Sequence, residues 1–410
     1  MFTLEEKSKV KELYGEVWSK IQNEHVRCFK GMDKPLFLIS TTYPGVWMEH
    51  IYDSVMYAYL CDEGKQIARN TIETFISFQH DDGHLPFCVV DGGIEPSGQT
   101  RVGYSQIQEV VSFAKLAYMT YNFFPEKEYL EKIYKACVGW DKWLTNNRMT
   151  LGKGLIEMFV GFDTGHDNSA RLDKMTCHGN YTKDGERQDA SVLPPNDPVV
   201  PIIAVDMNCN FYAGKRALAK MAKQLGDYNA AAKWEEEAAA VKQKMMEICY
   251  DEEDMFFYDV DKNGNKRKCK SCTVFHLFME GVLWPEEKLA IDIYEKHIKN
   301  PQEFWTEYPF PSMAINDPAW KKTSPKNCWG YFSQALIALR TTMWMERYGK
   351  QEDMLTIMEK WVKAWTACYE EIKFGQELDP ITGQPSDCSQ WYSSCMLYYV
   401  YSVRKLGLLD

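Results

Sequence analysis

The sequence predicts an all-α protein, a single-domain (α/α)6 barrel or toroid that spans residues 1–410 and carries its long loops on one rim. Three observations lead to this prediction. Apolar residues recur with helical periodicity along most of the 410 residues. Short turns between some helices alternate with long junctions rich in Gly, Pro, Trp and Asp. With 45% hydrophobic and 14% aromatic residues, the chain can fill one large core and line a pocket.

The expected helices follow one another from the N-terminus. The first has a stripe of apolar residues on one face, spaced at i, i+3, i+4, i+7, i+8 and i+11: Val10, Leu13, Tyr14, Val17, Trp18 and Ile21. Similar periodicity recurs at residues 50–61, 65–80, 104–122, 127–147, 205–225, 229–248, 273–282, 286–299, 330–348, 352–371 and 388–405. In a ring of helix hairpins, one rim carries short turns such as Gly226–Asp227, and the other collects long loops around a cavity. The long junctions here are 31–48, 81–103, 149–204, 300–329 and 372–387.

Two local patterns suggest other structures. Residues 226–245 resemble one hairpin of a tetratricopeptide array, but no period of about 34 residues recurs, so an α-solenoid is disfavoured. Residues 259–264 match the first half of a calcium loop, but its twelfth position is Lys270, where a bidentate Glu is required. A turn at residues 262–265 that joins two short strands, the first being FFYDV at 256–260, is the better interpretation.

The charge and the cysteine content limit the possible binding partners and the cellular compartment. The formal net charge is -11 and no basic run exceeds the short KRKCK at residues 266–270, so we expect no nucleic-acid partner. An apolar stretch of about 18 residues is lacking, so we expect no membrane partner and a cytoplasmic protein. The 13 cysteines are odd in number and scattered, which favours reduced thiols. Cys269 and Cys272 have no second pair beside them, so we expect no metal site and no cofactor.

One irregular loop holds much of the hydrogen-bonding chemistry of the chain. Residues 164–173 read TGHDNSARLD, with two acids, a guanidinium, an imidazole and an amide in ten positions. No helical or strand period orders these residues, and they lie inside the longest junction of the chain. In a toroid, such a loop would fold over the central cavity.

The chain resembles the α-toroidal glycosidases related to processing α-glucosidase, trehalase, and the mannosylglycerate and glucosylglycerate hydrolases. The run GHDNSAR at 165–171 is similar to the G-W-D-N-S-P-R signature of that group. Further similarities follow the same order along nearly the whole chain: WMEHIYDS at 47–54 to W-x-W-D-S, YSQ at 104–106 to S-Q-P-P, VDMN at 205–208 to V-D-L-N, NCWG at 327–330 to Y-W-R-G, and FGQELDPITGQP at 374–385 to F-P-E-Y-F-x-P-x-T-G-E-P. The resemblance is specific for the superfamily and weak for the substrate.

The resemblance implies an inverting hydrolase that cleaves a small α-linked glucoside or mannoside. Inversion needs a protonated carboxyl at the leaving oxygen and a carboxylate that activates water, about 6.5–9.5 Å apart. Asp167, the aspartate of the signature, would be the general acid; the alternative is an ordinary turn or capping residue. Arg171 would neutralise a neighbouring acid or hold the loop, although a plain surface ion pair is also open.

The second carboxylate is where the chain departs from the pattern. Gln376 aligns with the catalytic base Glu, and an amide cannot accept a proton from water at neutral pH. Three explanations are open. The first is a deliberate replacement of a natural Glu by Gln376, and the second is a role for Glu377 as base after a shift of one residue. The third is that the protein has lost hydrolysis and become a binding protein or acquired other chemistry. We expect Gln376 to face Asp167 across the cavity and Glu377 to point away from it.

Sugar-binding proteins stack aromatic rings on sugar faces and hold the hydroxyls with amides and acids. Several such residues match the binding positions of the group, and for each one alone core or rim packing is as good an interpretation. They are Tyr43, Trp47, Asp53, Gln106, Asn168, Arg171, Trp329, Gly330 and Trp391. The long loops would enclose a small carbohydrate. Whether the chain forms a homo-oligomer stays open.

Two other functions remain open. A sugar 2-epimerase also uses an (α/α)6 barrel but needs inward-facing histidines as acid and base. The histidines in or beside long loops are His50, His84, His166 and His178. A sugar-binding protein without catalysis is the other possibility, and a natural Gln at position 376 would favour it.

Overall fold

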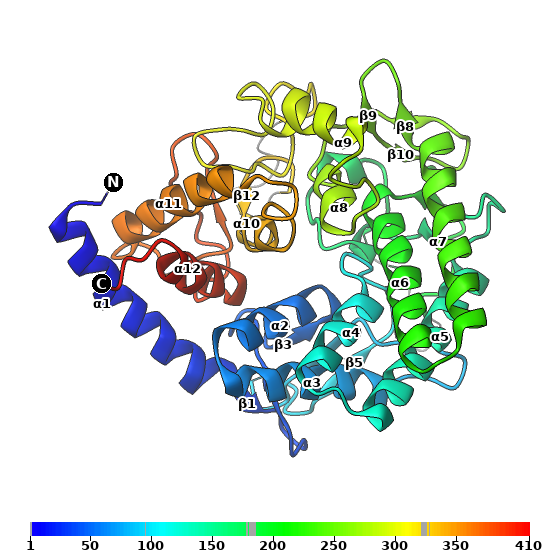
Figure 1. Ribbon diagram of the computed structural model, residues 1–410, viewed down its shortest axis with the longest axis horizontal. Coiled ribbons are helices and arrows are strands. Elements are labelled where there is room, and N and C mark those ends of the chain that lie inside the picture. Colours follow the sequence, from blue (N-terminus) through cyan, green and yellow to red (C-terminus); the bar gives the residue numbers. More distant parts are fainter. Residues whose placement is uncertain (1, 95, 178, 180–185, 321–325, 328) are drawn as a thin grey trace.

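The computed structural model describes residues 2–94, 96–177, 179, 186–320, 326–327 and 329–410. Twelve α-helices within these ranges alternate between an inner and an outer layer of one closed ring (Figure 1). The inner helices are α2 (Ile51–Leu60), α4 (Phe113–Phe123), α6 (Val205–Gln224), α8 (Val274–Met279), α10 (Ala335–Arg340) and α12 (Ser393–Lys405). The outer helices are α1 (Leu4–Lys20), α3 (Asp62–Ser77), α5 (Lys127–Asn147), α7 (Tyr228–Ile248), α9 (Lys288–Ile293) and α11 (Gln351–Cys368). The predicted (α/α)6 toroid is confirmed.

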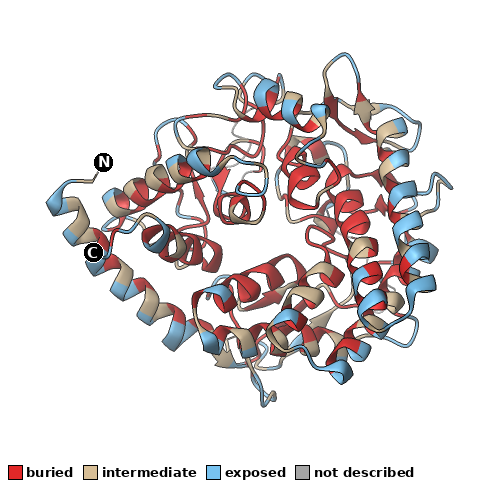
Figure 2. Cartoon of the chain, in the orientation of Figure 1, coloured by how far each residue is buried: buried red, intermediate tan, exposed pale blue. Residues whose placement is uncertain are grey.

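The two layers differ in how their sequences are buried (Figure 2). In α2, every residue except Tyr59 is buried, and all residues of α8 and α10 are buried. An inner helix has neighbours on both sides and behind it, so most of its residues are buried. The outer helix α7 buries only a stripe of four residues at helical spacing: Ala231, Ala238, Val241 and Met245. The remaining faces of α7 meet solvent, which explains its charged sequence.

Local capping signals set several helix ends. Thr3 and Glu6 form a reciprocal capping box at the start of α1. Gly226 adopts a positive φ of 86° after α6, and the Asp227 side chain then accepts a hydrogen bond from the Ala230 amide at the start of α7. This confirms the predicted tight turn between these two helices.

Some predicted boundaries are wrong. The helix expected at 104–122 begins at Phe113, because Ser112 caps it and residues 104–112 run as a loop. Apolar residues of that loop, such as Ile107 and Val111, pack into the core and so imitate a helical stripe. Likewise α10 begins at Ala335 instead of 330, and α12 at Ser393 instead of 388. In each case non-helical residues occupy the start of the predicted range.

Short antiparallel strands occur in the long junctions. β3 (Gly45–Trp47), β4 (Cys88–Val90) and β5 (Arg101–Gly103) form one sheet, and β12 (Ser333–Gln334) pairs with β13 (Glu377–Leu378). A four-stranded sheet has the order β11 (Lys266–Arg267), β10 (Asp259–Val260), β7 (Ile202–Ile203) and β6 (Glu157–Met158). The two remaining pairs are β1 (Val26–Cys28) with β2 (Pro35–Phe37), and β8 (Tyr250–Asp251) with β9 (Phe256–Phe257). These pairings give fixed geometry to segments that have no helical period.

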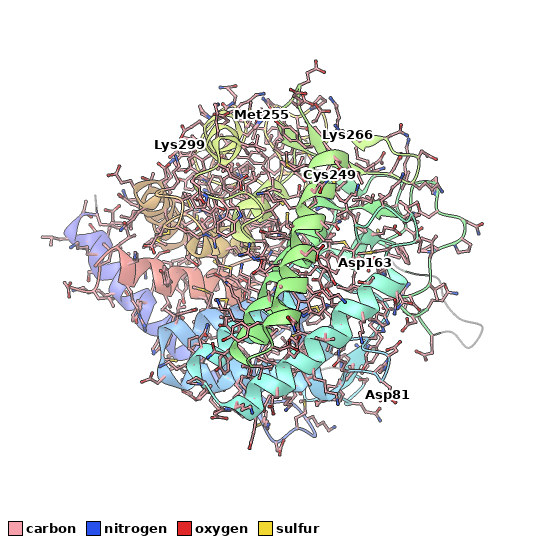
Figure 3. The ribbon with its side chains drawn as sticks, turned by 45° about the vertical axis from the view of Figure 1, so that its right-hand side comes forward. Asp81, Asp163, Cys249, Met255, Lys266 and Lys299 are labelled. Carbon is pink, nitrogen blue, oxygen red and sulfur yellow. The ribbon has the colours of Figure 1, made fainter. Side chains whose placement is uncertain are left out.

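Residues 259–264, which match the first half of a calcium loop, belong to a β-hairpin. β10 and β11 pair antiparallel, and Gly264 between them has a positive φ of 84°. The predicted turn is therefore confirmed, although the expected first strand FFYDV is divided between β9 and β10 at Tyr258. Figure 3 shows Lys266 of this hairpin above the C-terminal end of α7, and Asp163 beside the C-terminal end of α5.

Candidate active site

A cavity of about 650 Å³ opens within the ring. All five long junctions named from the sequence contribute to its lining, together with segments beside them. The predicted site residues that line it are Tyr43, Trp47, Gln106, Asp167, Trp329 and Gln376. This volume suits a small ligand, because pockets for small molecules typically measure about 300–1,000 Å³.

Asp167 lies in a turn that reaches into this cavity. Asn327 Nδ2 donates a hydrogen bond of 2.9 Å to Asp167 Oδ2, and the Trp329 amide donates to the Asp167 carbonyl at 3.1 Å. Burial raises the pKa of the Asp167 carboxyl to about 6, although the Asn327 hydrogen bond lowers it. The carboxyl therefore keeps a proton closer to neutral pH than an ordinary aspartic acid does.

Asn168 continues the same turn. Its φ is 58°, in the left-handed region that Asn tolerates well, and its side-chain amide donates to the Asn327 carbonyl at 2.7 Å. The Asn168 side chain is exposed and does not line the cavity. Asn168 therefore ties the turn that carries Asp167 to the loop before α10.

Arg171 anchors the other end of the loop in the protein interior. Its guanidinium donates two hydrogen bonds to Asp206, of 2.7 and 2.9 Å, and one of 2.8 Å to Asp259. Arg171 is buried and does not line the cavity, so it neutralises neighbouring acids as anticipated and is placed away from a bound ligand. Burial opposes ionisation of Asp206, but the charge of Arg171 outweighs it and holds the pKa of Asp206 well below its usual range.

Gln376 and Glu377 lie on opposite sides of their extended segment. Gln376 lines the cavity, and its Nε2 donates to Asn327 Oδ1 at 3.0 Å. Since the same Asn327 amide also binds Asp167, Gln376 Nε2 and Asp167 Oδ2 are within about 8 Å of one another. The buried Glu377 carboxylate accepts hydrogen bonds from the Asn327 amide, Gln334 Nε2 and Ser386 Oγ, and it does not line the cavity.

Aromatic residues form part of the wall. Tyr43 and Trp47 pack edge to face with ring centroids 5.9 Å apart, and Tyr43 also meets Tyr392 edge to face at 6.4 Å. Trp329 stacks on His166 with centroids 4.3 Å apart, which holds the loop that bears Asp167. Rings of this kind present apolar faces and edges on which a sugar can pack.

Three other residues predicted to bind substrate lie away from the cavity. Asp53 is fully buried and accepts hydrogen bonds from the Ser393 and Ser394 hydroxyls, so it joins α2 to α12 inside the core. Trp391 packs against the Phe374 ring and under the Lys20 ammonium group on the outside of the barrel. Gly330 is buried next to Trp329 without lining the cavity.

Glu49 is a cavity residue that the sequence motifs did not assign. It lies in the 3-10 turn Met48–His50 before α2, and only 4% of its surface is exposed. Burial raises the pKa of its carboxyl to about 7; Arg340 lowers the pKa, while the negative charge of Asp167 raises it further. A signal was present in the run WMEHIYDS at 47–54, because Glu49 and His50 stand where the W-x-W-D-S pattern has no such residues.

The candidate histidines are dispersed. His50 lines the cavity and its Nε2 is 2.6 Å from the Tyr392 hydroxyl, while burial holds the pKa of His50 well below its usual range. His166 supports the Asp167 loop from behind, and His84 stacks on Trp143 with its Nδ1 3.3 Å from Asp189. His178 lies outside the described residues. His80, which was not singled out, lines the cavity.

Within the ranges given above, no group of three or more His, Cys, Asp or Glu residues is placed to hold a metal ion. No helix in those ranges is long and apolar enough to cross a membrane. Cys269 and Cys272 are free thiols, and burial raises the pKa of Cys272 to about 12.

A closed double ring of helices with a cavity walled by carboxyls, amides and aromatic rings defines an (α/α)6-toroid protein with the kind of pocket that carbohydrates occupy. The chain belongs to the mannosylglycerate hydrolase MGH1-like glycoside hydrolase domain family, whose model matches residues 57–394. It therefore carries a glycoside hydrolase domain.

Solved structures share the fold. The GH63 mannosylglycerate hydrolase from Thermus thermophilus, solved with glucose, has a TM-score of 0.70 and 17% sequence identity, with 96% of this chain and 99% of that chain covered. Neutral trehalase Nth1 from Saccharomyces cerevisiae has a TM-score of 0.65 and 14% identity, with 90% of this chain and 73% of that chain covered.

An uncharacterized protein of Borreliella burgdorferi is similar in sequence. It is 24% identical over 145 residues, which are 35% of this chain and only 29% of that protein's length.

Proposed function

We propose that the protein is an inverting glycoside hydrolase that cleaves a small α-linked glucoside or mannoside, with Asp167 as the general acid. The observation that carries the proposal is the position of the Asp167 carboxyl in the cavity, where burial raises its pKa to about 6. A general acid works best when its pKa lies near the working pH. The family assignment and the cavity of about 650 Å³ support a small carbohydrate substrate.

In this reaction Asp167 gives its proton to the glycosidic oxygen as the bond from that oxygen to C1 breaks. Water adds to C1 from the opposite face and gives up a proton to a second carboxylate, so the product has the inverted configuration. Tyr43 and Trp47 would pack on the sugar, and Gln106 and Gln376 would bind its hydroxyls. The free buried cysteines favour the reducing cytoplasm as the place of action.

Anomeric NMR tests the proposal directly. The purified chain is incubated with a panel of small α-glucosides and α-mannosides, including mannosylglycerate, and the first product anomer is recorded before mutarotation. We expect release of the β anomer. Release of the α anomer would show a retaining mechanism, and the absence of hydrolysis on every substrate would overturn the proposed function.

A sugar 2-epimerase is the second candidate, because His50 and His80 both line the cavity. Epimerisation at C2 exchanges the C2 hydrogen with solvent. Incubation of free mannose or glucose with the protein in deuterated water therefore distinguishes the two functions. Deuterium at C2 would favour the epimerase, and release of sugar from a glycoside without exchange would favour the hydrolase.

A further inference from the structure

The surroundings of Gln376 are complementary to an amide. Gln376 Nε2 donates to Asn327 Oδ1 at 3.0 Å and to Gln334 Oε1 at 3.3 Å, while the Cys388 thiol donates to Gln376 Oε1 at 3.5 Å. Gln334 cannot turn its amide around, because its own Nε2 binds Glu377 at 2.7 Å. A carboxylate at position 376 would therefore face two amide oxygens, which repel it.

An inverting hydrolase still requires a carboxylate that accepts a proton from water. Glu377 is buried behind the cavity wall, where an amide, a side-chain amide and a hydroxyl already donate to it. The proton acceptor must therefore come from another part of the wall.

Glu49 is a second carboxyl in the cavity wall, and one of its oxygens has only a long contact with Arg340. Its carboxyl packs against the Gly165 backbone, where a Cβ atom at position 165 would fall 1.9 Å from Glu49 Oε2. Gly165 is two residues before Asp167, so the two cavity carboxyls are held on adjoining segments. Glu49 Oε1 is buried without a hydrogen-bond partner among the described residues, and Arg340 Nη2 lies 3.5 Å from it.

We propose that Glu49 is the proton acceptor of this site, the carboxylate that deprotonates the attacking water while Asp167 protonates the leaving oxygen. This inference rests on the proposed hydrolase function. The water oxygen forms a bond to C1, the bond from C1 to the glycosidic oxygen breaks, Asp167 loses a proton and Glu49 gains one. Exchange with solvent then returns both carboxyls to their starting states.

Both carboxyls of the pair exchange protons near neutral pH. Burial raises the pKa of Glu49 to about 7 and that of Asp167 to about 6. Because neighbouring carboxyls titrate as a pair, the form with one proton is most populated between these values. Glu49 holds that proton in the major form, and the proposed reaction proceeds through the minor form, in which the proton is on Asp167. The charged and titratable groups around Glu49 are Arg340 of α10, Asp167, Asp53 of α2, Tyr43 and Tyr392.

Isosteric substitution with a matched control tests the proposal. Glu49→Gln is compared with Glu109→Gln, a change at another buried carboxyl that lies outside the cavity and accepts a hydrogen bond from Trp140. On the α-glycoside that the parent hydrolyses best, we expect Glu49→Gln to lower kcat by about 10²–10⁴ with little change in KM. The acidic limb of the pH–rate profile should disappear. Glu109→Gln should retain the parental rate and profile.

Azide separates a base from a positioning residue. Glu49→Ala leaves room for a small anion that attacks C1 without needing deprotonation, so added sodium azide should restore leaving-group release and yield a β-glycosyl azide. Circular dichroism and thermal melting establish that the variant is folded. A structural role for Glu49 would give neither rescue nor this product.

Other results of these experiments would contradict the proposed role of Glu49. Parental activity in Glu49→Gln, or a loss of kcat with both limbs of the pH profile intact and no azide product, would overturn the role of Glu49. A rise in activity of 100-fold or more in Gln376→Glu would also overturn it, because it would place the base at position 376. Such a rise corresponds to about 3 kcal/mol of transition-state stabilisation. A parent chain that hydrolyses no α-glycoside would instead remove the proposed function itself, and this inference with it.

Discussion

Two groups of buried acids flank the loop at residues 165–171, and they differ in how closely a guanidinium group contacts them. Behind the loop, Asp206 and Asp259 bind the Arg171 guanidinium at 2.7–2.9 Å. In the cavity, Asp167 binds an amide, and Glu49 lies 3.5 Å from Arg340. The pKa of Asp206 is held well below its usual range, whereas burial raises the pKa of Asp259 despite its single bond to Arg171. The pKa values of Asp167 and Glu49 rise to about 6 and about 7.

The difference lies in the contacts of the guanidinium groups. Asp206 and Glu49 are both almost completely buried, so desolvation opposes ionisation in both. Arg171 forms a two-pronged pair with Asp206, which is the strongest arrangement for a carboxylate. Arg340 also binds the Glu49 carbonyl, at 3.3 Å, and meets the carboxyl only at a distance. A two-pronged guanidinium pair keeps the buried Asp206 ionised, whereas the distant guanidinium of Arg340 leaves Glu49 able to exchange protons.

The largest expected effect is on catalysis at Asp167. Asp167→Asn keeps the shape of the side chain and removes the proton donor, so kcat should fall by about 10²–10⁴ while the melting temperature stays near that of the parent. Asp206→Asn is the matched change in the other group and should act mainly on stability. Parental hydrolysis by Asp167→Asn would place the acid elsewhere.

Removal of the anchoring guanidinium is expected to have the next largest effect. Arg171→Met leaves Asp206 and Asp259 as buried charges without their partner, which should lower the free energy of unfolding by about 3–5 kcal/mol. Arg340→Met breaks one hydrogen bond to the Glu49 carbonyl and a long contact with the Glu49 carboxyl, so it should cost less. Chemical denaturation of both variants measures the difference, and equal losses would contradict the contrast drawn between the two groups.

The pH dependence of stability should expose the raised pKa of Glu49. Between pH of about 4.5 and 7 the folded carboxyl holds a proton that the unfolded one has released, so this group makes the fold less stable as pH rises. Glu49→Gln removes that slope, so its stability relative to the parent should increase by on the order of 3 kcal/mol across this range. Denaturation at several pH values measures this difference. Glu377→Gln is the comparison, because the Glu377 carboxylate already accepts hydrogen bonds from neighbouring donors.

A smaller effect is expected from crowding between the two cavity carboxyls. In Gly165→Ala the new methyl group would fall 1.9 Å from Glu49 Oε2, so the Glu49 side chain must move at a cost of about 1–3 kcal/mol. Combining Gly165→Ala with Glu49→Ala should recover part of this stability. Additive losses in the double variant would show that position 165 does not contact Glu49.

Helical periodicity was sufficient to predict the toroid, but not where every helix begins. The tight turn at Gly226–Asp227 was readable because Gly supplies the positive φ and Asp caps the next helix. The start of α4 could not be predicted from the sequence, because apolar loop residues such as Ile107 are buried by the barrel and look like part of a helical stripe. Local rules describe capping and periodicity, whereas burial of a loop depends on what folds over it.

Sequence by itself determined the ring of helices, the long junctions that meet at the cavity, and the candidacy of Asp167. Only the tertiary structure decided which acids lie with a guanidinium and which do not. Arg171 and Asp206 are 35 positions apart, and Glu49 meets Gly165 across more than a hundred. Spacing along the chain cannot report such contacts, because they are made by segments that approach one another only when the barrel closes. The state of a buried carboxyl is set by the partners that this closure brings to it.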